Sequence, residues 1–328
     1  MSLSNATADF IISLNNISDI LNSYLSIFIF IFGLIGNSLN IIVLSQRTLR
    51  SNPSAVSFLV SSIAGIIVIL SGLTSRMLSG YGNDLTLTVD WICKIRNFIL
   101  YASRTILLWL IALATIDRWL SSSAVVHMRQ MSNLKNAQGS MFIIFIYTCF
   151  INAPILYCYE ANLTGVLRGC YGSTYTCRLT TDLIYAFGTT LLPLLLMIIF
   201  GLLTIRNVHH IQNRVHGNTT MTTPKSSEQT RAKKTDRQLL KMLLVQMTLL
   251  LVFTGPHAIQ KVYSSFAPSL PSNSLENSIQ NLIFTIFTLM TFIGSGMPFY
   301  IYTLTGGSIF RNALVDVVKT VIQKLLCH

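Results

Sequence analysis

The sequence predicts an all-α membrane protein, a seven-transmembrane helix bundle followed by a short amphipathic eighth helix. Of the 328 residues, 52% are apolar and only 10% are charged, whereas a soluble domain carries about 25% charged residues. Apolar runs recur along the chain, each long enough to cross a hydrocarbon core of about 30 Å. Lysines and arginines gather between these runs. Together these observations predict a protein that crosses the membrane repeatedly.

The positions of the basic residues predict its orientation. A net charge of +12 does not indicate nucleic acid, because basic clusters between apolar spans follow the positive-inside rule. Segment 206–241 is rich in lysine and arginine, whereas segment 264–277 has neither. We therefore expect a multi-pass plasma-membrane protein with an extracellular N-terminus, whose nonspecific partner is membrane lipid rather than nucleic acid.

The first, second and fourth spans are read from hydropathy and flanking charge. The first, about 24–45, is followed by two arginines, as expected at a cytoplasmic end. The second, about 54–75, is rich in serine and glycine and has no acidic residue. The fourth, about 139–158, has Pro154 near its outer end.

The third span, about 91–119, organises the bundle. At about 100° per residue, Cys93, Arg104 and Arg118 fall within roughly 40° of one another on one face of the helix. A mid-bilayer arginine costs about 2.5–3.5 kcal/mol on the insertion scale, so this face cannot meet lipid. We expect it to line a polar interior.

The last three spans each contain a proline. They cover about 181–205, 237–263 and 278–304, and the prolines are Pro193, Pro256 and Pro298. Proline is tolerated within a transmembrane helix because neighbouring helices and water satisfy the freed carbonyl. The seven spans predict a transmembrane domain of residues 24–305.

Each end of the chain has sequence features that indicate the side of the membrane on which it lies. Residues 1–23 are expected to form a polar extracellular tail, and glycan acceptor sequences start at Asn5 and Asn16, with another at Asn162 in the predicted outer loop 159–180. Residues 306–328 form the predicted cytoplasmic end.

The cytoplasmic end has apolar residues at helical spacing with basic residues between them, which predicts an amphipathic helix on the inner membrane surface. Cys327 is either an acylation site or an unmodified cysteine.

The order of these landmarks resembles the rhodopsin-like G-protein-coupled receptors over about residues 24–325. The loops and the fifth span are also similar to invertebrate neuropeptide receptors of the FMRFamide type. The resemblance is carried by Gly36-Asn37, Trp91 with Cys93, Asp117-Arg118-Trp119, the three prolines and Phe310-Arg311.

The sequence also departs from the family pattern. Gly65 stands where the second helix usually carries an aspartate that helps to hold sodium, and Thr254 replaces the tryptophan of the sixth helix. The seventh helix reads Met-Pro-Phe-Tyr-Ile from Met297, without the family's asparagine and tyrosine; Tyr302 is one residue out of register. The activation relay is therefore expected to differ from that of other members.

The resemblance implies a disulfide and a cytoplasmic switch. Cys93 is expected to bond Cys170 or Cys177, with Cys170 favoured. Asp117 and Arg118 are expected to form the switch that couples to the G protein. Asp236 is either the acid that holds Arg118 in the closed state or a solvated residue at a helix start.

The outer half of the bundle is basic, and the candidates for a ligand pocket are Arg76, Arg96, Arg104, His257 and Lys261. One interpretation is a pocket that accepts an anionic group. In the alternative, Arg104 bonds helix carbonyls and the other basic residues meet acids such as Asp84, Asp90, Glu160 or Asp182.

The function expected from these features is a receptor that transduces an extracellular ligand, a peptide, to a heterotrimeric G protein. The alternative is a multi-span transporter or a channel-like protein, although such proteins use carboxylates within the membrane and the only acid firmly inside a span is Asp117, at its cytoplasmic end. No arrangement of residues indicates an enzyme, a cofactor or a metal site. Residues 278–304 contain no lysine, which excludes a retinal Schiff base in the seventh span.

Overall fold

The computed structural model describes residues 2–80, 84–161, 170–217, 227–266 and 274–305, with four single positions beyond them. Within this part of the chain, seven helical segments are long and apolar enough to cross a membrane. Of the predicted eighth helix only positions 314, 315, 319 and 323 are described, and they are helical. Asn162 and Cys327 lie outside the described residues, as do the side chains of Asn5 and Asp236.

The predicted spans all correspond to helices. They are α1 and α2 (Ser2–Ile20 and Ser26–Leu44) with a π-helical turn between them (Leu21–Leu25); α4 (Pro53–Gly80); α5 (Asp90–Ser122); α7 and α8 (Leu134–Asn152 and Pro154–Cys158); α9 and α10 (Tyr175–Leu183 and Leu192–Gly217) with a π-helical segment between them (Ile184–Leu191); α11 (Ser227–Phe266); and α12 and α13 (Leu275–Gly296 and Pro298–Thr305). Short helices α3 (Arg47–Arg50) and α6 (Val126–Met131) lie between spans.

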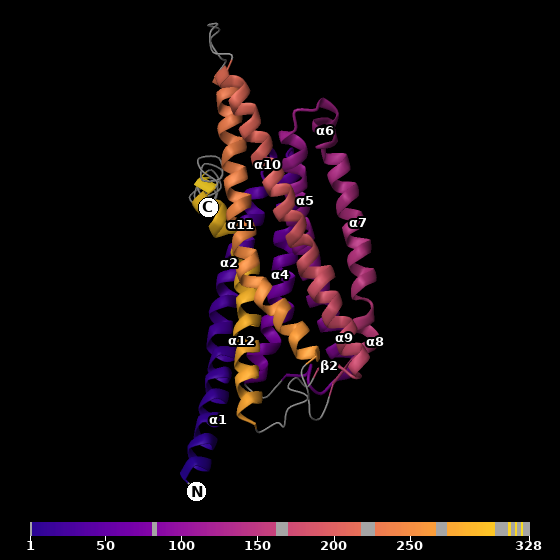
Figure 1. Ribbon diagram of the computed structural model, residues 1–328, viewed down its shortest axis with the longest axis vertical. Coiled ribbons are helices and arrows are strands. Elements are labelled where there is room, and N and C mark those ends of the chain that lie inside the picture. The colour runs from indigo at the N-terminus through magenta and orange to yellow at the C-terminus, as the bar shows by residue number, and fades with distance from the viewer. Residues whose placement is uncertain are drawn as a thin grey trace.

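The two ends of the bundle differ. Strands β1 (Tyr159–Glu160) and β2 (Tyr171–Gly172) pair antiparallel, with Tyr159 opposite Gly172. This small sheet lies at the same end as the start of α1, whereas α6 and the long ends of α10 and α11 lie at the opposite end (Figure 1). We call them the sheet end and the α6 end.

The first helix begins much earlier than the sequence analysis placed it. Residues 2–20 were expected to be a polar tail, but they form α1, which packs against α12. Leu14 and Ser18, one helical turn apart, are buried, and the Ser18 hydroxyl lies 3.1 Å from that of Thr285. This contact face is narrow, so hydropathy alone did not reveal it.

Prolines shape three of the helices. The fourth span breaks at Ala153, and Pro154 starts α8. The π-helical segment of the fifth span ends at Leu191, two residues before Pro193. Proline has no N–H and its ring clashes with the carbonyl four residues back, so a wider turn accommodates it. Pro298 starts α13 after an interruption at Met297.

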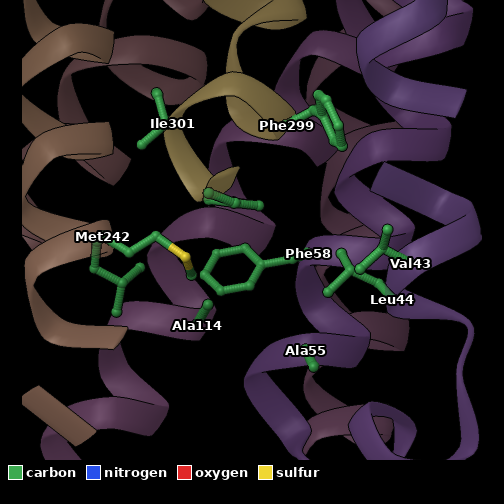
Figure 2. Close-up of a cluster of buried hydrophobic side chains, with 10 residues drawn as sticks. Val43, Leu44, Ala55, Phe58, Ala114, Met242, Phe299 and Ile301 are labelled. Carbon is green, nitrogen blue, oxygen red and sulfur yellow. The ribbon is translucent and has the colours of Figure 1, made fainter. Parts of the chain in front are cut away.

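A buried apolar cluster joins five helices in the half of the bundle nearer the α6 end. The Phe58 ring points into its middle, with Met242 on one side and Val43 and Leu44 on the other (Figure 2). The Tyr302 ring packs against Phe58 at a centroid distance of 5.1 Å. Because this cluster includes residues of α5, α11 and α13, it fixes the positions of these three helices relative to one another.

Candidate functional site

Two disulfides fasten the sheet end. Cys93, in the first turns of α5, is bonded to Cys170, next to β2, with a Cα–Cα distance of 5.8 Å. Cys158 is bonded to Cys177, which joins the end of α8 to α9. The sequence analysis did not pair these last two. Four cysteines allow three connectivities, and the spacing alone did not distinguish them.

A cavity of about 270 Å³ opens beneath the sheet. Residues from α4, α5, α11 and α12 and from β2 line it. Arg76, Arg96, Arg104 and His257, four of the five predicted pocket residues, are on its wall. Arg104 lies about 16 Å below Cys93 by helix rise. The cavity therefore reaches from the disulfide into the bundle.

The two arginines nearer the sheet end have partners. Arg96 donates from Nε to the Ser71 carbonyl at 2.8 Å and from Nη2 to the Gly72 carbonyl at 2.9 Å. It also donates to Asn97 and Ser75. Arg96 thus ties α5 to α4.

Arg76 donates to Asn22 Oδ1 at 2.6 Å, which ties α4 to the first span.

Arg104 is held differently. Its side chain is only 3% exposed, and its guanidinium carbon lies 4.9 Å from the centre of the Phe292 ring. Nη1 donates to the Tyr185 hydroxyl at 3.4 Å, a long hydrogen bond. Nε and Nη2 have no hydrogen-bond partner among the described residues. The alternative interpretation expected Arg104 to bond helix carbonyls, and no helix carbonyl is among its partners in the described part of the chain.

Lys261, the fifth predicted pocket residue, is not among the residues that line this cavity; it meets Asp182, as the alternative interpretation expected. Its ammonium group lies 2.5 Å from Asp182 Oδ1, and the two side chains are 1% and 0% exposed. Tyr171 and Ser265 both donate to Asp182 Oδ2. An ammonium group this deeply buried requires a paired acid. The pair connects α9 to α11.

His257 is buried and lines the cavity. Its Nδ1 lies 3.5 Å from the Thr288 hydroxyl, at the limit of a hydrogen bond. Its ring meets that of Tyr185 edge-on at a centroid distance of 5.4 Å. His257 therefore places α11 at the cavity wall and in contact with Tyr185, the hydrogen-bond partner of Arg104.

At the α6 end, Asp117 and Arg118 share a partner that the sequence analysis missed. Arg118 donates from Nε to Ser54 Oγ at 2.9 Å and from Nη2 to Asn52 Oδ1 at 2.5 Å. Ser54 in turn donates to Asp117 Oδ2 at 2.5 Å, and Ser132 donates to Oδ1 at 2.6 Å. The only feature of the sequence that could have indicated these contacts is the polar Asn-Pro-Ser stretch at the start of the second span.

The comparisons with known proteins agree with this geometry. Residues 36–302 match the family model of the 7 transmembrane receptor (rhodopsin family). The chain belongs to the rhodopsin family of seven-transmembrane receptors. No curated protein matches it in sequence. The crystal structure of squid rhodopsin is similar in fold, with a TM-score of 0.74 and 17% sequence identity, covering 93% of this chain and 87% of that chain.

The receptor fills the place of the missing second-helix acid with an asparagine. A Cβ atom on Gly65 would lie 2.8 Å from Asn37 Oδ1. The Asn37 amide nitrogen donates to the carbonyls of Gly33 and Ser295, at 2.9 and 3.2 Å. Asn37 thus joins the first and seventh spans and occupies the space that a larger residue at position 65 would need.

Tyr302 provides an unexpected link to the sixth span of the receptor. Its hydroxyl donates to Gln246 Oε1 at 2.7 Å, and both side chains are about 1% exposed. The bond joins α13 to α11. The one-residue shift relative to the family tyrosine therefore leaves Tyr302 with a buried partner on α11.

Proposed function

We propose that this receptor binds an extracellular peptide at the sheet end and activates a heterotrimeric G protein at the α6 end. The observation that carries the proposal is that α5 bears both sites, because Arg104 lines the cavity and Arg118 follows on the same helix. Fourteen residues of helix separate them by about 21 Å. The exposed Asn16 on α1 supports an extracellular N-terminus.

A peptide fits the chemistry of the cavity wall better than an apolar ligand. The wall combines arginines, amides and hydroxyls with the rings of Tyr101, Tyr159 and Tyr171. Polar groups at fixed positions orient a ligand, and aromatic faces provide contact area. A peptide offers both backbone hydrogen-bonding groups and side chains to such a wall.

The proposed mechanism is a shift between two states of the bundle. Ligand contacts with α5, α11 and α12 favour the state in which α11 swings outward at the α6 end, and a ligand shifts the equilibrium only by its difference in affinity for the two states. Arg118 is 8% exposed, so a protein that binds from the α6 end has little access to it. The arrangement described here therefore suits the closed state.

A neuropeptide library applied to cells that express the receptor tests this function. We expect at least one peptide to produce a G-protein response. Guanine nucleotide should then lower the affinity of that peptide in isolated membranes, because it uncouples the G protein. Substrate flux without nucleotide sensitivity would instead indicate the transporter alternative.

The switch is proposed to consist of Asp117, Arg118 and Asp236, with Asn52 and Ser54 added by the contacts of Arg118. Asn52 and Ser54 hold Arg118 against α4, inside the bundle. Asp236 was expected either to hold Arg118 or to be a solvated residue at a helix start, but α11 begins at Ser227, which makes Asp236 its tenth residue. This position is beyond the first turn, where the helix dipole favours an acid, so the remaining alternative to closing α11 onto Arg118 is a solvated acid within the helix.

Removing one of these contacts should raise ligand-free signalling. We expect about a two- to fivefold increase for Asn52→Ala and for Asp236→Ala, because a partly solvated contact of a charged group is worth about 0.5–1 kcal/mol. Basal G-protein activity at equal surface expression measures this. Ser57→Ala is the matched control, since Ser57 bonds only the Pro53 carbonyl among its described partners. If Asn52→Ala raises activity and Asp236→Ala does not, Asp236 does not hold Arg118 in the closed state.

A further inference from the structure

Arg104 is a buried cation with unused hydrogen-bonding capacity. It is 3% exposed and lines the cavity, and two of its three nitrogens have no partner within the described part of the receptor. Burying a charged group without hydrogen bonds destabilises the folded state. A buried cation with unused hydrogen-bond donors is suited to bind a group of a ligand that enters the cavity.

The two unpartnered nitrogens lie on the same edge of the guanidinium. The N–H bond of Nε and one N–H bond of Nη2 run nearly parallel within the plane of the group. Two parallel donors match the two oxygens of a carboxylate, which arginine binds through two simultaneous hydrogen bonds. The remaining nitrogen, Nη1, contacts Tyr185, and the Phe292 ring covers one face. These contacts orient the guanidinium and leave its pairing edge available.

The nearby acids of the described chain have other partners. Asp182 is paired with Lys261. Asp84, which lines the same cavity, accepts hydrogen bonds from the backbone and hydroxyl of Thr86. The other two arginines on the wall already donate to α4 and to Asn22. The wall therefore has a specific position for an added negative charge.

We propose that Arg104 binds a carboxylate of the ligand through Nε and Nη2. The proposal rests on the proposed function of the cavity as the ligand site and adds the chemical class of the group that docks there. In a peptide this carboxylate is either the C-terminus or an aspartate or glutamate side chain. An amine ligand without an acid is not expected to occupy this position.

The proposal predicts opposite effects for two arginines on one helix. Arg104→Gln removes an unsatisfied charge, so the ligand-free receptor should unfold at the same temperature as wild type or higher. Arg96→Gln removes bonds to two backbone carbonyls, so it should unfold at a lower temperature. The two residues belong to the same helix and line the same cavity, which makes Arg96 a matched control.

Benzoate is a suitable probe, with benzamide as the uncharged molecule of the same shape. Full-length receptor in lipid nanodiscs is heated with increasing benzoate, benzamide or sodium chloride. We expect benzoate alone to raise the unfolding temperature, because a ligand stabilises the state that it binds. Arg104→Gln should weaken the apparent affinity for benzoate at least tenfold, and Arg104→Lys should weaken it less. Lys94→Gln should retain the affinity, because Lys94 belongs to the same helix but is not among the residues that line the cavity.

Three results would overturn the proposal: equal stabilisation by benzamide, unchanged benzoate binding in Arg104→Gln, or no benzoate effect up to its solubility limit. This test needs no G protein, so it is independent of the signalling assay. For a peptide that activates the receptor, the C-terminal amide and the Asp→Asn or Glu→Gln forms are then compared with the parent. The form that loses at least tenfold in potency, in wild type but not in Arg104→Gln, identifies the source of the carboxylate.

Discussion

Asp182→Ala is expected to destabilise the receptor by about 3–5 kcal/mol, the range for removing one member of a buried ion pair. The change leaves the ammonium group of Lys261, which is 1% exposed, without its acid. Tyr171 and Ser265 lose their acceptor at the same time. We therefore expect strongly reduced surface expression and a lower unfolding temperature in purified receptor.

A second substitution separates the cost of the unpaired charge from the value of the pair. Replacing both members of a buried pair with apolar residues is often neutral, so Asp182→Ala with Lys261→Met should recover most of the lost stability. The control is Asp90→Ala, because the Asp90–Lys94 pair has side chains that are 52% and 27% exposed, and solvent-exposed pairs contribute little to stability. Equal losses at Asp182 and Asp90, or no recovery in the double variant, would contradict this account.

The Lys261–Asp182 pair also separates what the sequence predicts from what it does not. Hydropathy predicted the spans, because each must bury its backbone polar groups in a helix to cross lipid. The helical spacing of Cys93, Arg104 and Arg118 placed them on one inward face, and the structure buries all three. Such periodicity reports the direction in which a side chain points. It does not report which residue of another helix it meets.

Contacts between helices were therefore the part that could not be predicted. Lys261 was left as either a pocket cation or the partner of one of several acids, Asp182 among them, because the alignment of α9 against α11 was unknown. Asn52 and Ser54 precede or begin a span and carry no charge, so nothing marked them as partners of Arg118. Arg104 was left with two interpretations, and the sequence did not reveal that its described partners are Tyr185 and Phe292 rather than helix carbonyls.

The loss of the Cys93–Cys170 disulfide is expected to abolish the ligand response. Cys170 lines the cavity and directly precedes Tyr171, which donates to Asp182. Without the bond to α5, β2 is no longer held over the cavity, and the contact with the Lys261–Asp182 pair weakens. We expect at least a hundredfold loss of potency in the Cys93→Ser, Cys170→Ser double variant, measured with an activating peptide at matched surface expression.

The second disulfide is the control for this prediction. The two bonds close segments with sequence separations of 77 and 19 residues, for which chain entropy gives about 4.5 and 3.3 kcal/mol. Both double variants should therefore unfold at lower temperature, by similar amounts. Neither Cys158 nor Cys177 is among the residues that line the cavity, so their removal should leave potency within about threefold of wild type, a change of about 0.7 kcal/mol. If both variants lose potency equally at matched expression, the disulfides act on stability alone, and the position of β2 does not determine ligand binding.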